Sequence, residues 1–202
     1  MIRAVLWDFG GVFTTSPFEA FNAYEEERGL PKDFIRRLNA TNPDTNAWAQ
    51  FESNRVSGPE FDELFFQESG GKVRGADVMN LIYGRLRPKV IGALETCKGA
   101  GLKNGLITNN VASDRPQAPE LAAVFAQFDH VIESSKAGLR KPDPRIYALM
   151  CEALDVEARD CVFLDDLGIN LKPARAMGMT TIKVESEAQL LSDLAAATGL
   201  SL

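Results

Sequence analysis

Five short apolar runs recur along the chain, each bounded by charged residues or glycine. They are IRAVLW from residue 2, KNGLIT from 103, HVIES from 130, DCVFLD from 160 and TTIKV from 180. Continuous apolar runs of this length are typical of strands that are buried on both faces of a parallel sheet. The pattern therefore predicts five buried parallel strands.

Longer segments, in which apolar residues recur at helical spacing, separate the later runs. This spacing predicts helices over residues 88–100, 118–127, 144–154, 171–177 and 187–197. Strands that alternate with helices usually build a parallel sheet with helices on both faces. We therefore predict an α/β fold for this part of the chain.

The connection after the first run breaks the alternation. Residues 16–86 contain no strand-like run, but they include amphipathic stretches such as PFEAFNAYEEERG and GPEFDELFFQES. The segment is too long for a simple crossover and too apolar for a disordered loop. We predict that residues 16–86 form a helical cap domain and that residues 1–15 and 87–202 form an α/β core domain. The core of the cap is expected to contain five aromatic side chains: Trp48, Phe51, Phe61, Phe65 and Phe66.

Composition narrows the class of protein. The chain has 202 residues, of which 45% are hydrophobic and 25% charged, as in ordinary globular domains. A formal net charge of -6 repels polyanions, so we expect no nucleic-acid partner and no membrane partner. The three cysteines are widely spaced and form no CxxC pair, which favours buried thiols over disulfides or a zinc site. With no leader-like or membrane-spanning stretch, we expect a cytoplasmic protein. The sequence does not indicate an oligomeric state.

Polar residues follow the predicted strands at the places where ligands bind in open parallel sheets, beyond the carboxyl ends of the strands. They are Asp8 after the first run, Thr108, Asn109 and Asn110 at the end of the second, Lys141 in GLRKPDP after the third, and Asp165, Asp166 and Asn170 at the end of the fourth. Taken singly, such residues often cap turns or lie in solvent. Adjacent carboxylates repel each other, however, so the Asp165–Asp166 pair indicates a nearby cation or another group that compensates the charge.

In this order, the four motifs resemble the signature motifs of the haloacid dehalogenase superfamily, and residues 16–86 resemble its type C1 cap. The segments RKPDPRIY and VFLDDLGINLKPARAMGM are similar to the subgroup that includes the N-terminal phosphatase domain of soluble epoxide hydrolase. The resemblance implies a Rossmann-like parallel sheet with an inserted helical C1 cap. We expect no epoxide hydrolase domain after Leu202.

The resemblance also implies how the acidic residues act. Asp8 would be the nucleophile and would form an aspartyl-phosphate. The metal site would be Asp8, the backbone carbonyl of Gly10, and Asp166, with Asp165 orienting the site directly or through water. Asn170 would brace the acidic pair. The cofactor implied is Mg²⁺.

The same family implies how the phosphate is held. The Thr108 hydroxyl and the Asn109 amide would bind phosphate oxygens, and Lys141 would neutralise charge on the nucleophile and the transferring group. The substrate implied is a small organic phosphate, and an apolar cap lining would favour one with a hydrophobic part.

Gly10 departs from the family pattern. Phosphatases of this superfamily usually carry an aspartate there, which protonates the leaving oxygen and later activates water. General acid–base catalysis contributes about 10²–10⁴-fold, so we expect a weak or selective phosphatase. Two other functions stay open at this stage. One is a regulatory protein that binds phosphate without turnover. The other is a haloacid dehalogenase, in which Asp8 displaces halide and needs no second aspartate, although an acidic metal site argues against it.

Overall fold

The computed structural model describes residues 1–82, 84–111 and 118–202. Its centre is a sheet of five parallel strands in the order β3-β2-β1-β4-β5. The strands are β1 (Ala4–Trp7), β2 (Lys103–Thr108), β3 (His130–Glu133), β4 (Cys161–Asp165) and β5 (Thr180–Lys183). Each lies within a run predicted from the sequence, so the prediction of a parallel sheet is confirmed.

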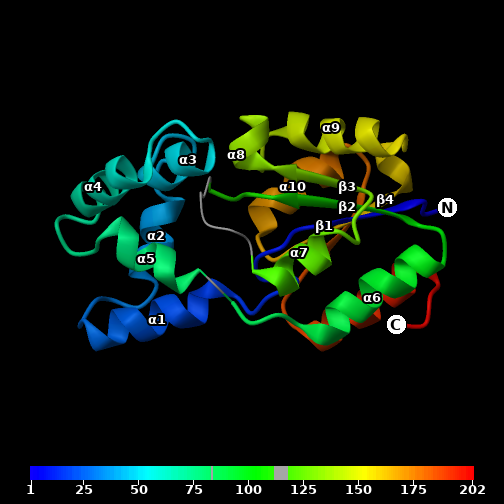
Figure 1. Ribbon diagram of the computed structural model, residues 1–202, viewed down its shortest axis with the longest axis horizontal. Helices are drawn as coiled ribbons and strands as arrows, with labels where there is room; N and C mark the ends of the chain where they lie inside the picture. Colours follow the sequence, from blue (N-terminus) through cyan, green and yellow to red (C-terminus); the bar gives the residue numbers. More distant parts are fainter. Residues whose placement is uncertain (83, 112–117) are drawn as a thin grey trace.

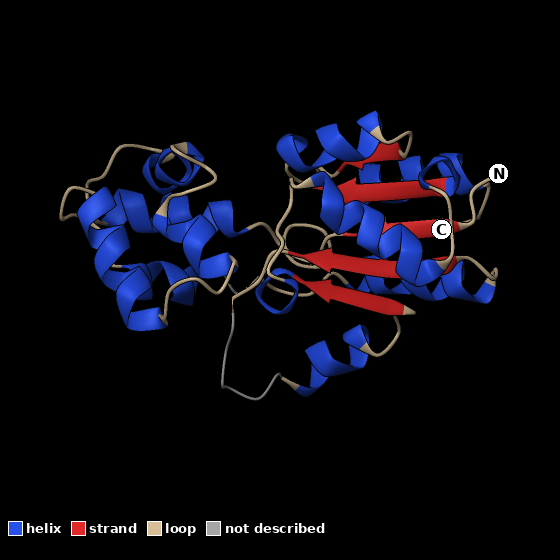
Figure 2. Ribbon diagram, turned by 90° about the horizontal axis from the view of Figure 1, so that it is seen from above, coloured by secondary structure: helices blue, strands red, loops and turns tan. Residues whose placement is uncertain are grey.

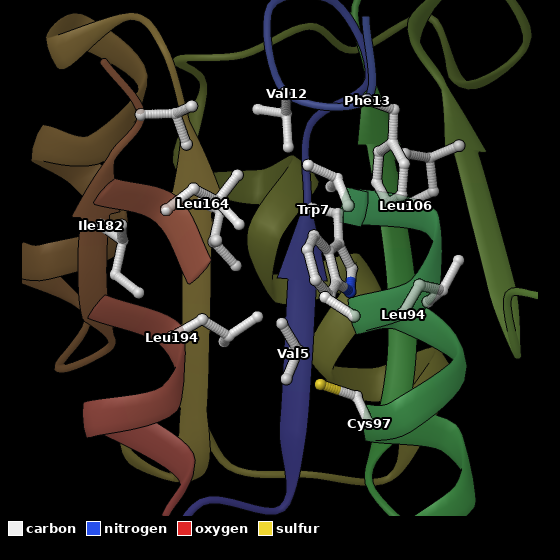
Figure 3. Close-up of a cluster of buried hydrophobic side chains, with 14 of the residues drawn as sticks. Val5, Trp7, Val12, Phe13, Leu94, Cys97, Leu106, Leu164, Ile182 and Leu194 are labelled. Carbon is white, nitrogen blue, oxygen red and sulfur yellow. The ribbon is translucent and has the colours of Figure 1, made fainter. Parts of the chain in front are cut away.

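Helices cover both faces of this sheet, as predicted (Figure 1). The helices α6 (Pro88–Gly99), α7 (Pro119–Phe125) and α11 (Glu187–Thr198) pack on one face. The helices α9 (Pro144–Leu154) and α10 (Gly168–Ala176) pack on the other. Alternate residues of β1 serve the two faces. Val5 and Trp7 enter the first apolar cluster, shown in Figure 3, and Ala4 and Leu6 enter the second.

Several boundaries differ from the sequence prediction, and two of them lie close to the carboxyl ends of strands. The run HVIES ends as a strand at Glu133, because the next residues form the short helix α8 (Ser134–Ala137). The helix α10 begins at Gly168 and not at residue 171, which places Asn170 in its first turn. The residues Gly-Ile-Asn that open α10 are poor helix formers, so the sequence pattern gave no signal there. A short 3-10 helix, η1 (Ala158–Asp160), precedes β4 and was also not predicted.

Five helices between β1 and α6 form a second cluster, which we call the helical group (Figure 2). They are α1 (Pro17–Glu27), α2 (Phe34–Ala40), α3 (Ala47–Glu52), α4 (Gly58–Glu68) and α5 (Gly75–Leu81). Phe51, Phe61 and Phe65 are buried together there, and Trp48 packs against them. Phe66 lies outside this cluster, half-buried, with the Arg74 guanidinium 3.9 Å above its ring. The ranges 16–86 and 87–202 include residues 83 and 112–117, which lie outside the described part of the chain.

The two connections between the helical group and the rest of the chain, the sheet body, lie side by side. Thr14 and Leu86 form an antiparallel bridge. The Thr15 amide donates to the Arg85 carbonyl at 2.9 Å, and the Arg85 amide donates to Thr15 Oγ1 at 3.0 Å. A Cβ at Gly84 would lie 2.3 Å from the Thr15 carbonyl oxygen, so only glycine permits this approach. The chain therefore leaves and re-enters the sheet body at one place.

Other sequence predictions can be compared directly. Cys97, Cys151 and Cys161 are free and buried, as predicted. His130 opens β3 at an exposed position, at the amino end of the strand. Among residues 1–82, 84–111 and 118–202, no helix combines the length and the apolar character needed to cross a membrane.

Candidate active site

The candidate site lies where the order of the strands reverses, between β1 and β4. Asp8 directly follows β1, Asp165 ends β4 and Asp166 follows it. The Asp8 amide donates to the Leu164 carbonyl at 2.9 Å, which fixes the two strand ends to each other. In open parallel sheets, such a reversal leaves a crevice outside the carboxyl ends of the strands. These ends point toward the helical group (Figure 2).

Lys141 is the cation of the site. Its Nζ lies 2.6 Å from Asp8 Oδ1 and 2.7 Å from Asp165 Oδ2, and its side chain is only 1% exposed. Burial by itself would lower the pKa of Lys141, but Asp165 and Asp8 outweigh burial and raise it. The lysine is therefore charged at neutral pH and joins the two carboxylates.

Asp165 is fully buried and held from several sides. Its Oδ1 accepts from the Leu167 amide at 2.8 Å, and the Asn170 side-chain amide lies 3.0 Å from both carboxylate oxygens. Asn170 is itself held, because the Tyr147 hydroxyl donates to its carbonyl at 2.7 Å. The structure thus places the Asn170 side chain against Asp165, one member of the acidic pair. Both carboxylate oxygens of Asp165 accept hydrogen bonds from protein donors.

Three carboxylates converge beside this single lysine. Oxygen atoms of Asp8, Asp165 and Asp166 all lie within 4.8 Å of one another. Burial raises the pKa of Asp166 to about 6, and the nearby Asp165 adds to the effect. Burial also raises the pKa of Asp8 well above its ordinary value, although Lys141 opposes it. The cluster holds more negative charge than one ammonium balances, and oxygen ligands suit Mg²⁺, so these residues fit a divalent cation.

The turn after Asp8 brings backbone close to this cluster. Gly11 has φ +73°, and a Cβ there would lie 2.3 Å from Asp166 Oδ2, so both conformation and space require glycine. Gly10 differs in both respects. It is exposed, its φ lies outside the left-handed region, and a Cβ would meet no atom within 4 Å. Position 10 therefore has room for a side chain.

Arg87 holds the same turn from the second connection to the helical group. Its Nη1 donates to the carbonyls of Gly11 at 2.9 Å and Val12 at 3.3 Å. Sequence reasoning did not identify this residue, because no motif or spacing distinguishes it from a surface arginine. Arg87 acts on the site by holding backbone, and its charge also opposes the raised pKa of Asp166.

The end of β2 carries Thr108, which is 7% exposed, next to β1 in the sheet. The side chain of Asn109 bonds in both directions to the main chain of Lys141. Its Nδ2 donates to the Lys141 carbonyl at 3.0 Å, and its Oδ1 accepts from the Lys141 amide at 2.9 Å. The sequence had assigned Asn109 to phosphate. In the structure, the Asn109 side chain is engaged by the main chain of Lys141.

Comparison with known proteins adds independent findings. A family model of haloacid dehalogenase-like hydrolases matches residues 2–178. The chain is 39% identical over 223 residues to the bifunctional epoxide hydrolase 2 of Rattus norvegicus, covering 98% of this chain and 39% of the relative. It thus spans about two fifths of the length of that relative. It is 34% identical over 202 residues to a phosphatase of Mycobacterium tuberculosis, covering 93% of this chain and 89% of the relative.

Solved structures show a similar fold. A HAD family enzyme of Bacteroides thetaiotaomicron, solved in complex with magnesium and inorganic phosphate, superposes with a TM-score of 0.61. The two chains are 18% identical, and the match covers 93% of this chain and 97% of that one. At this identity, the likeness supports the fold, and the parallel sheet described above agrees with it.

Proposed function

This chain belongs to the haloacid dehalogenase-like hydrolases, and we propose that it is a magnesium-dependent phosphatase of small organic phosphates. One observation carries the proposal: a buried lysine joins Asp8 to Asp165, while Asp166 brings a third carboxylate within 4.8 Å. Phosphoryl transfer depends mainly on positioning and on stabilising charge, which such a site provides. The phosphatase relative, which the chain matches along most of its length, supports the same reaction class.

Asp8 is the proposed nucleophile. One carboxylate oxygen attacks phosphorus, a new O–P bond forms, and the P–O bond to the organic group breaks with its electron pair. The leaving oxygen takes up a proton, and water then attacks the phosphorus of the aspartyl-phosphate, which releases inorganic phosphate and restores Asp8. Lys141 Nζ, 2.6 Å from Asp8 Oδ1, lowers the pKa of this carboxyl against the larger opposing effect of burial, and it keeps the carboxyl oriented.

Asp8, Asp166 and the Gly10 carbonyl are the proposed metal ligands, and Asp165 orients them. When bound, Mg²⁺ would neutralise charge on the phosphoryl group. Thr108 Oγ1 and the main-chain N–H of Asn109 bind phosphate oxygens in this proposal. We support these assignments by the shared location of the residues at the carboxyl ends of β1, β2 and β4.

The proposal extends to the helical group. We propose that residues 16–86 are a cap domain and residues 1–15 and 87–202 a core domain. The separate apolar cluster of the helical group and its paired connections support this division.

The free buried thiols support a reducing, cytoplasmic location.

The test is hydrolysis of a panel of aryl and alkyl phosphates by the purified protein, with Mg²⁺ titrated from zero. We expect turnover that requires Mg²⁺ and favours aryl phosphates, because Gly10 supplies no proton to a poor leaving group. Release of halide from a 2-haloacid, at a rate that does not depend on Mg²⁺, would instead establish a dehalogenase. Mg²⁺-dependent binding of inorganic phosphate without turnover of any ester would establish a binding protein.

A further inference from the structure

One side chain of the helical group reaches the segments that carry the proposed phosphate-handling residues. Glu52, the last residue of α3, is 7% exposed. Its Oε2 accepts two hydrogen bonds from Arg140, from Nε at 3.0 Å and from Nη2 at 2.6 Å. Arg140 also donates from Nη1 to the Pro43 carbonyl at 2.8 Å. These three hydrogen bonds all join the Arg140 guanidinium to the helical group.

The second contact of Glu52 is through its backbone. Its carbonyl accepts from Ser134 Oγ at 2.8 Å, and the same hydroxyl accepts from the Asn110 amide at 3.0 Å. Glu52 therefore contacts two segments of the sheet body, one through Arg140 and the other through Ser134. These segments are joined to each other, because the Asn109 side chain bonds both ways to the main chain of Lys141.

The chain of contacts ends at the site. Arg140 directly precedes Lys141, whose Nζ lies 2.6 Å from Asp8, and Asn110 lies two residues after Thr108. A displacement of Arg140 would be passed through one peptide unit to Lys141. Misplacement of a catalytic group by about 1 Å can cost about a hundredfold in rate, so the position of this segment matters for turnover.

Stability alone gives a poor account of this ion pair. A carboxylate is disfavoured at the end of a helix, and a buried ion pair is often no more stabilising than apolar packing. The helical group already has its own apolar cluster. A cavity of about 390 Å³ lies beside Arg140, between Asp44, Ser53 and Arg55 of the helical group and residues 138–140 and 142–145 of the sheet body. The side-chain contacts that Arg140 makes with the helical group beside this cavity are polar.

We infer that Glu52 is a positioning residue, which holds the Lys141 and Asn109 segments in register with the helical group through Arg140 and Ser134. The inference rests on the proposed phosphatase function, because turnover is its first readout. Through the Glu52–Arg140 contact, the position of Lys141 depends on how the helical group packs against the sheet body. The helical group would thus affect the geometry of the site.

The contacts suggest a conservative variant. Both carboxylate oxygens of Glu52 accept hydrogen bonds, Oε1 from Trp48 Nε1 at 2.8 Å and Oε2 from Arg140. Glu52→Gln keeps the size but can present an oxygen to only one of these donors, and it removes the charge. We expect kcat/KM for an aryl phosphate to fall about ten- to hundredfold, carried by kcat, with KM changed less than about threefold. Arg140→Gln should give a similar loss, and the double variant should be no worse than either single variant.

Two matched controls separate positioning from folding. Trp48→Phe removes the indole donor to Glu52 and keeps an aromatic ring, although a smaller one, against Phe61 and Phe65. Arg74→Gln removes an exposed ion pair within the helical group, that of Arg74 with Asp62 and Glu63. Both should keep kcat/KM within about twofold of the parent, as expected for groups that do not touch the site. Glu52→Asp, which keeps the charge on a shorter side chain, should recover part of the rate lost in Glu52→Gln.

A kcat/KM for Glu52→Gln within about twofold of the parent would overturn the inference, as would losses in the two single variants that simply multiply in the double. A second measurement does not need turnover. Amide hydrogen exchange at residues 109–111 and 139–141 should be faster in Glu52→Gln than in Arg74→Gln. If the parent hydrolyses no ester, the proposed function fails, and the exchange result alone decides this inference: equal exchange in the two variants would refute it.

Discussion

The most direct test of the site chemistry is to restore an acid at position 10. Gly10→Asp places a carboxyl group on the exposed turn that follows Asp8. The backbone at Gly10 does not require glycine, and a Cβ there meets no atom within 4 Å. Replacing a glycine at such a position typically stabilises a protein by about 0.4–1 kcal/mol, because the unfolded chain loses freedom. Repulsion from the nearby carboxylates opposes this gain, so we expect the melting temperature to change little.

The magnitude of the gain in rate follows from the proton that the leaving group needs. An aryl oxygen leaves without help, whereas an alkyl oxygen leaves poorly unless it is protonated. Full general acid catalysis contributes about 10²–10⁴-fold. The residues around Gly10 are not arranged to orient a carboxyl group at this position. We therefore expect kcat/KM to rise about tenfold for alkyl phosphates and about twofold or less for aryl phosphates. Repulsion from Asp8 and Asp166 should raise the pKa of the new carboxyl, which favours the protonated form that acts as the acid.

The assay is kcat/KM for one aryl and one alkyl phosphate at saturating Mg²⁺, in parent and variant. Gly10→Asn is the matched control, since it has the same shape but cannot donate a proton as an acid does. Gly11→Ala is the contrasting variant, because φ is +73° and its Cβ would lie 2.3 Å from Asp166 Oδ2. It should lose activity and stability together.

Three results would refute this reasoning. Equal aryl and alkyl rates in the parent would mean that another group already supplies the proton. Equal gains in Gly10→Asp and Gly10→Asn would assign the effect to the backbone. An unchanged ratio of aryl to alkyl rates in a folded Gly10→Asp variant would mean that protonation of the leaving group does not limit the reaction.

Four further predictions concern the residues around this turn. Asp8→Asn should reduce turnover by at least about 10³-fold, because an amide is a poor nucleophile, and aryl phosphate hydrolysis near the parent rate would exclude a covalent step on Asp8. The pKa of Asp166 is raised to about 6, so the folded chain binds a proton there more tightly than the unfolded chain does. The metal-free protein should therefore gain stability from this group as the pH falls from about 7 to about 5, and Mg²⁺ affinity measured by calorimetry should fall over the same interval. Asp166→Asn should remove the response to Mg²⁺ and raise the melting temperature of the metal-free protein. A lower melting temperature would contradict an unfavourable burial of the Asp166 charge. Arg87→Met should weaken Mg²⁺ binding by about three- to tenfold by releasing the Gly11 and Val12 carbonyls, which a calorimetric Kd equal to that of the parent would disprove.

The sequence predicts the sheet well because its signal is local. A strand that is buried on both faces has a nearly continuous apolar sequence, so β1, with the sequence AVLW, is found within the predicted run. The sequence also predicts that two of the polar groups at the strand ends lie close together. Asp8 and Asp166 follow strands whose carboxyl ends share one edge of the sheet.

The contacts that hold these groups could not be predicted in the same way. Arg87 and Glu52 each contact residues that are distant in the sequence. In the sequence, each looks like an ordinary charged surface residue. Asn109 was recognised as a candidate, but the sequence does not reveal that its side chain comes within hydrogen-bonding reach of the Lys141 main chain. Local patterns report which residues a strand end carries, whereas the partners of those residues depend on how distant segments pack.

The paired connections at Thr14–Leu86 and Thr15–Arg85 have a consequence for how such a molecule can change over generations. A segment that departs and returns at adjacent points can be lengthened, shortened or exchanged as a unit, because the distance that the replacement must bridge stays the same. The strands that carry Asp8 and Asp165 would keep their register through such an exchange. The helical group and the acidic site can then be inherited separately, with variation arising by replacement of one continuous stretch of gene.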